Sequence, residues 1–163
     1  MRRSLMVVGL ALWCLHACGL AFSGDFVAVI ASPKFPADGV TASELRDLYL
    51  GRSDALSGRK VAVFHLSPQN AARALFERVV VGKEGTELRS HWIDLKLTRP
   101  GVVEPRSFRN PEGLVELVAT SDDAVAYVPL SSAAGRPVKV LRLDGRSPEA
   151  GAAGGYPLAL PDK

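Results

Sequence analysis

The sequence predicts an α/β domain with a parallel or mixed β-sheet flanked by helices. Short apolar runs rich in β-branched residues alternate with helical patterns along the chain. An alternating order favours this class over separate all-α and all-β layers. The chain has 163 residues, and about 140 remain after a predicted leader. This length is sufficient for one domain with its own core but short for two.

The first 23 residues have the layout of a cleaved secretory signal, because two arginines precede an apolar run at residues 5–15 and small residues follow. We expect cleavage after Ser23, which leaves residues 24–163 as one periplasmic domain without a membrane span. Lipidation at Cys18 is a less favoured alternative, since His16 makes the lipobox imperfect. An uncleaved anchor is also less favoured, because the run is short for a spanning helix.

Both cysteines, Cys14 and Cys18, precede the predicted cleavage site. A chain cut there would have no disulfide, no Cys-ligated metal and no Cys nucleophile. Removing Arg2 and Arg3 from the 20 basic and 17 acidic residues leaves 18 against 17, a formal charge of +1. Nucleic-acid binding requires a concentrated cationic face, so we expect none.

The first half of the domain is predicted to begin with a strand and a capped helix. Residues 26–31 form an apolar run that ends at a Ser-Pro pair, as expected for a buried strand leading into a loop. Thr41 and Glu44 form a capping box at the start of a helix, and Gly51 marks its end.

A second strand and helix follow at residues 61–64 and from Ser67 onward. The sequence predicts Ser67 as the helix N-cap, with Pro68 in the first helical position and Gly82 at the end. This order places a polar loop and a helix start directly after a strand.

The second half is predicted to contain two more helices and two more strands. A helix is expected over residues 85–95, with Leu88, Trp92 and Leu95 on its buried face. After a loop at 100–105, the pattern predicts a helix beginning at Pro111 and strands at 124–128 and 138–143.

Five features follow one another in a recognisable order: the capped helix at 40–51, the helix start at 70–76, the Leu88 and Trp92 pair, the strand at 123–128, and the closing pattern at 138–158. In this order they resemble the periplasmic phosphate-binding proteins of ABC transporters, part of the type II periplasmic binding protein superfamily. The resemblance extends over nearly all of the mature chain. It implies a type II periplasmic-binding-protein-like fold in a short, single-lobe form.

In that family, backbone N–H groups at helix starts, Ser or Thr hydroxyls and often an Arg near a Ser-Gly-Thr turn hold the oxyanion. Here the corresponding positions are Asn70, Ala71 and Ala72, so two hydroxyls and a glycine are missing. The candidate ligand-binding residues are Ser32, Ser67, Asn70 and Arg73. Two of them have ordinary alternatives, because Arg73 could be a solvated surface residue and Ser32 a plain turn residue.

The resemblance predicts a solute-binding protein for phosphate or a similar small oxyanion, serving an ABC permease or a periplasmic sensor. The alternative is an interaction or regulatory module that keeps the fold, binds no oxyanion and works with a protein partner. We expect no cofactor, metal site or enzymatic activity. His65 and His91 lack metal-ligand spacing, and no acid partner is recognisable for His65 beside Ser67.

Overall fold

The computed structural model describes residues 25–161. The predicted signal sequence, its cleavage after Ser23 and the alternative lipidation at Cys18 lie outside these residues. Within the described part of the chain, no helix is long and apolar enough to cross a membrane.

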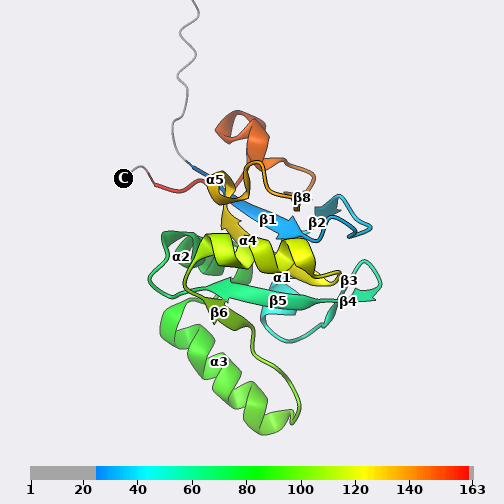
Figure 1. The fold of residues 1–163 in the computed structure, drawn as a ribbon. Helices are drawn as coiled ribbons and strands as arrows, with labels where there is room; N and C mark the ends of the chain where they lie inside the picture. Colours follow the sequence, from blue (N-terminus) through cyan, green and yellow to red (C-terminus); the bar gives the residue numbers. More distant parts are fainter. Residues whose placement is uncertain (1–24, 162–163) are drawn as a thin grey trace, which may run out of the picture.

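The centre of the domain is a mixed sheet of six strands in the order β2-β8-β1-β7-β5-β6 (Figure 1). Strand β1 runs antiparallel to both of its neighbours, β7 and β8, whereas the other neighbouring pairs are parallel. The predicted α/β class with a mixed sheet is therefore confirmed. The six strands are β1 (Val27–Ala31), β2 (Gly39–Val40), β5 (Ala62–Leu66), β6 (Arg106–Phe108), β7 (Ala124–Pro129) and β8 (Lys139–Leu143).

Helices cover both faces of this sheet. Figure 1 shows α4 in front of the sheet, α1 and α2 behind it, and α3 projecting from the body of the domain. A separate hairpin, β3 (Ala55–Leu56) and β4 (Arg59–Lys60), lies at one end. The helices are α1 (Ala42–Tyr49), α2 (Ala71–Phe76), a π-helix (Glu77–Val81), α3 (Gly85–Thr98), α4 (Pro111–Thr120), α5 (Leu130–Ala133) and two 3-10 turns (Pro148–Ala150 and Ala152–Gly154).

An aromatic cluster forms the core between the sheet and α1 and α2. The rings of Phe76 and Tyr127 are stacked with centroids 3.9 Å apart, and Tyr49 meets Phe76 edge-on at 4.9 Å. All three residues are buried. Such aromatic contacts stabilise a core beyond the burial of apolar area alone, so this cluster fixes α1 and α2 against β7.

The predicted start of α1 is confirmed. The Thr41 hydroxyl accepts a hydrogen bond from the Glu44 backbone N–H at 3.2 Å, and the Glu44 carboxylate accepts one from the Thr41 N–H at 2.8 Å. These reciprocal bonds satisfy backbone donors that a helix start leaves without partners. Trp92 is buried, as its spacing with Leu88 and Leu95 predicts.

The predicted start of α2 is wrong, because Asn70 and not Ser67 is the N-cap. The Asn70 Oδ1 accepts a hydrogen bond from the Ala72 N–H at 2.9 Å. Before it, the Asn70 N–H donates to the Ser67 carbonyl at 2.9 Å. Residues 67–70 therefore form a tight turn with Pro68 in its second position, where the fixed φ of proline is favourable. Pro68 therefore stabilises the turn that precedes α2 and is not part of the helix.

Candidate functional site

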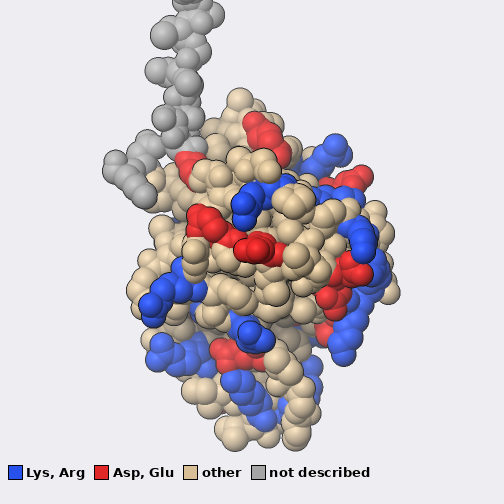
Figure 2. All heavy atoms as spheres, in the orientation of Figure 1, with Lys and Arg blue, Asp and Glu red and all other residues tan. Residues whose placement is uncertain are grey.

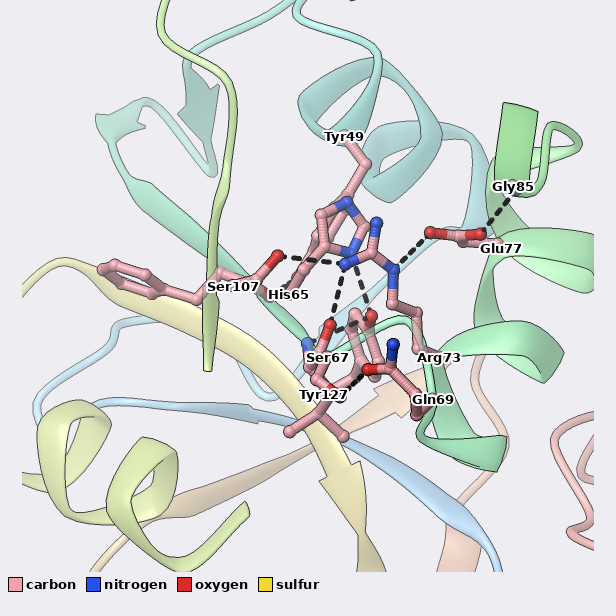
Figure 3. Close-up of polar contacts among 11 residues, drawn as sticks. Tyr49, His65, Ser67, Gln69, Arg73, Glu77, Gly85, Ser107 and Tyr127 are labelled. Atoms are coloured by element: carbon pink, nitrogen blue, oxygen red, sulfur yellow. Dashed lines mark hydrogen bonds and ion pairs between the residues drawn. The ribbon is translucent and has the colours of Figure 1, made fainter. Parts of the chain in front are cut away.

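Three of the four predicted site residues lie together where β5 ends and α2 begins. Strand β5 ends at Leu66, and the turn through Ser67 and Asn70 leads to Arg73 in the first turn of α2. The parallel neighbour β6 adds Ser107, which no sequence pattern predicted. Figure 3 shows that the Arg73 guanidinium reaches back over this edge of the sheet.

The Arg73 side chain is held by three acceptors. Its Nη1 donates to the Leu66 carbonyl at 2.8 Å and to the Ser107 hydroxyl at 3.0 Å, and its Nε donates to Glu77 Oε1 at 2.5 Å. Only 15% of the side chain is exposed, so Arg73 is not the solvated surface residue of the alternative interpretation. Its Nη2 donates no hydrogen bond within residues 25–161 and is the guanidinium nitrogen that remains available to a ligand.

Glu77 is a buried carboxylate that orients Arg73. The residue is 4% exposed, and its second oxygen accepts a hydrogen bond from the Gly85 N–H at 3.1 Å (Figure 3). Buried charges are normally paired and hydrogen-bonded, and here the guanidinium and the Gly85 amide satisfy both carboxylate oxygens. The i, i+4 spacing of Arg73 and Glu77 is a sequence signal that could have identified this pair.

Ser67 and Asn70 already make local hydrogen bonds. The Ser67 hydroxyl donates to Gln69 Oε1 at 2.9 Å, and the Asn70 oxygen caps α2. The side-chain NH₂ of Asn70 donates no hydrogen bond within the described residues. Of the groups predicted to bind an anion, this amide and the Nη2 of Arg73 are the donors that remain.

Ser32 does not join this site. Because β1 is antiparallel to β7, the residue after β1 lies beside the beginning of β7, where its N–H donates to the Ala124 carbonyl at 3.3 Å. Ser67 follows the end of β5, which is parallel to β7. The two serines therefore lie at opposite ends of the strands. Ser32 is 1% exposed, and its hydroxyl accepts a hydrogen bond from the Lys34 N–H, as in an ordinary turn.

His65 belongs to the aromatic core and not to a nucleophile–base pair. Its Nδ1 lies 2.8 Å from the Tyr127 hydroxyl, which also accepts a hydrogen bond from the Leu66 N–H at 3.4 Å. Burial, assisted by the nearby Arg73 charge, lowers the pKa of His65 to about 3. The imidazole is consequently neutral near pH 7, and the Ser67 hydroxyl beside it in sequence is bonded to Gln69 instead.

A cavity of about 410 Å³ opens beside Arg73, between α2, the start of α3 and β6. Two guanidinium groups, of Arg73 and Arg89, line it together with three carboxylates, of Glu77, Glu84 and Glu104. The lining therefore carries no excess of positive charge. Figure 2 likewise shows basic and acidic side chains interspersed over the visible face. Within residues 25–161, no group of three or more His, Cys, Asp or Glu side chains could hold a metal ion.

Comparison with solved structures identifies the architecture around this site. A candidate phosphate ABC transporter substrate-binding protein from Clostridium perfringens, solved with bound phosphate, superposes with a TM-score of 0.68 and 19% identity over 84% of this chain and 53% of its own. An ABC-type phosphate transport receptor from Vibrio cholerae gives 0.66 and 19% over 84% of this chain and 54% of its own. The chain has the fold of these phosphate-binding proteins.

The predicted resemblance to the phosphate-binding-protein fold is thus confirmed. The chain spans about half the length of these two structures. No family model matches the chain, and no curated protein matches it in sequence. The order of the motifs was sufficient for this prediction because it reflects the order of strands and capped helices along the chain. Proteins of one fold keep this order even when most of their residues differ.

Proposed function

We propose that the chain is a periplasmic solute-binding-like protein that takes phosphate or a similar small oxyanion at the carboxyl ends of β5 and β6. The observation that carries this proposal is the fixed orientation of the Arg73 guanidinium group. Leu66, Ser107 and Glu77 hold two of its nitrogens and leave Nη2 free. A guanidinium that is already ordered loses little entropy on binding and suits the geometry of an oxyanion.

The Asn70 amide is the second proposed donor. Asn70 and Arg73 are one helical turn apart, linked by the bond from the Arg73 N–H to the Asn70 carbonyl at 3.0 Å. Glu77 offsets the charge of Arg73, however, and a single lobe supplies one wall of a cleft. We therefore infer weak binding by the isolated chain, strengthened when a permease or a periplasmic sensor covers the site.

A second candidate function is an interaction or regulatory module that binds no oxyanion. The observation in its favour is that the Ser67 hydroxyl and the Asn70 oxygen are consumed by local bonds, beside a cavity lined by more carboxylates than guanidinium groups. In this case Arg73 and Glu77 serve the stability of the fold.

Equilibrium dialysis with labelled phosphate at low ionic strength tests the first proposal. Asn70→Asp keeps an oxygen to cap α2 but replaces the amide donor by a negative charge, so binding should be lost while the melting temperature changes little. Arg73→Lys should weaken binding about ten-fold or more, because a lysine cannot present the fork. Arg78→Lys, on the exposed surface of the π-helix, is the matched control and should bind as the wild type does.

Absence of saturable phosphate uptake by the wild type at millimolar concentration would remove the oxyanion proposal. A stable protein partner that co-purifies from the periplasm without bound anion would then support the interaction module. Equal uptake by the wild type and Asn70→Asp would show that the ligand lies elsewhere on the domain.

A further inference from the structure

A larger cavity lies away from the Arg73 site, at the end of the sheet where β5 begins. Its volume is about 600 Å³, and the β3-β4 hairpin, β5 and the segment between α3 and β6 enclose it. Ligand sites for organic molecules have volumes of about 300–1,000 Å³. The size is therefore suited to a small organic ligand.

On β5 and β6 the cavity is lined by an aromatic ring, of Phe64, and a cation, of Arg106. Phe64 and Arg106 are directly paired across the two parallel strands, so both side chains project from the same face of the sheet. Phe108, two residues further along β6, meets Phe64 edge-on at 5.6 Å on that face. Phe64 lines the cavity and is half-buried.

The segment between α3 and β6 provides further apolar lining of the cavity. Val102 and Val103 line the cavity, and Val103 is 79% exposed. Parallel strands are normally covered on both faces, so the exposed part of Phe64 and the two valines that line the same cavity are apolar surface that a ligand could bury.

Positive charge predominates among the lining side chains. Four are basic and two are acidic, an excess of two positive charges. Lys60 pairs with Asp54 at 3.2 Å, and Glu104 pairs with Lys96. Within residues 25–161, Arg106 forms no ion pair.

From the aromatic surface, the valine wall and the unpaired Arg106, we propose that this cavity binds small organic anions with an apolar body, such as aromatic carboxylates. The ring lies against Phe64 and the valines, and the carboxylate faces Arg106. Inorganic phosphate lacks the apolar part that would bury this surface. The cavity is thus a second site that does not include Arg73, although Glu104 lines both cavities.

Chemical-shift mapping with 3-phenylpropionate as the probe tests this assignment. Titration should shift the backbone amides of Phe64, Val102 and Arg106 saturably, and those around Arg73 should not move. The neutral 3-phenylpropionamide should bind distinctly more weakly, because it fits the apolar surface but offers no charge.

The double variant Lys60→Gln, Arg106→Gln removes two of the four positive charges that line the cavity, both at exposed positions. It should weaken binding of 3-phenylpropionate about five-fold, because it removes the contact with Arg106 and the net positive charge of the lining. Arg78→Gln, Arg89→Gln changes the net charge equally at exposed positions outside the cavity and should change affinity less than about two-fold, since distant surface charges are screened.

Three results would each overturn the proposal: no saturable shifts at millimolar probe, shifts confined to the surroundings of Arg73, or equal affinity for the acid and the amide. Unchanged affinity of the Lys60→Gln, Arg106→Gln variant for 3-phenylpropionate would also overturn the proposal. None of these depends on whether phosphate binds at Arg73.

Discussion

Arg73 and Glu77 form a nearly buried ion pair one helical turn apart, with Nε and Oε1 separated by 2.5 Å. The pair spans the junction between α2 and the π-helix that follows it. Through Ser107 and Gly85, the same two side chains also connect this junction to β6 and to the start of α3. The pair therefore joins four consecutive parts of the fold as well as orienting the proposed anion donor.

Glu77→Gln should lower the free energy of unfolding by about 3 kcal/mol, because removing one partner leaves the other charge nearly buried and unpaired. Urea denaturation measures this loss. Glu87→Gln is the matched control, since Glu87 pairs with Lys83 at the same i, i+4 spacing but is 63% exposed. That change should cost no more than about 0.5 kcal/mol. Similar losses in both variants would contradict a structural role for the Arg73–Glu77 pair.

His65 should make stability depend on pH in the acid range. Its pKa is about 3 in the folded protein and near the ordinary 6.5 when unfolded, so the unfolded chain binds more protons between these values. The stability from the neutral imidazole is complete above pH 6.5 and decreases as the pH falls, by about 2.7 kcal/mol on reaching about pH 4.5.

His65→Gln should remove this part of the pH dependence, measured as the free energy of unfolding at several pH values. Tyr127→Phe is the control: it deletes the hydroxyl beside Nδ1 but leaves the imidazole buried, so the dependence should persist. A slope that is unchanged by His65→Gln would show that His65 does not titrate differently in the folded and unfolded states.

Gly51→Ala should destabilise the domain by about 2–4 kcal/mol through backbone strain and a steric clash. Gly51 has φ of +65°, and an added Cβ would lie 2.8 Å from the Trp92 ring and 2.9 Å from Leu95. Gly58 has φ of +75° with no atom within 4 Å of an added Cβ. Gly58→Ala should therefore cost about 1 kcal/mol, from strain alone. Equal shifts in thermal melting would contradict the steric contribution.

Local patterns predicted most of the regular elements. The capping box at Thr41 and the apolar runs of β1 and β7 depend on residues close together in sequence, and their predictions agree with the structure. The patterns missed β2, the β3-β4 hairpin and β6, because strands of two or three residues are too short to show alternation. Missing β6 also meant missing Ser107.

The candidate site could be predicted only in part. Ser67, Asn70 and Arg73 are neighbours in sequence, so their proximity followed from the strand-turn-helix pattern. Ser32 was grouped with them, although the antiparallel direction of β1 places it at the opposite end of the strands. Strand direction depends on long-range pairing, and a single apolar run such as residues 26–31 carries no information about it.

The sequence by itself determined the α/β class, the start of α1 and the order of motifs that matches the phosphate-binding-protein fold, because these depend on local hydrogen bonding and on periodicity. Only the tertiary structure decided the partners of Arg73 and His65. Tyr127 is 62 residues from His65, and Ser107 is 34 residues from Arg73. Such contacts form when strands align in the sheet, so the chemistry of the predicted site, unlike its location, was set by long-range packing.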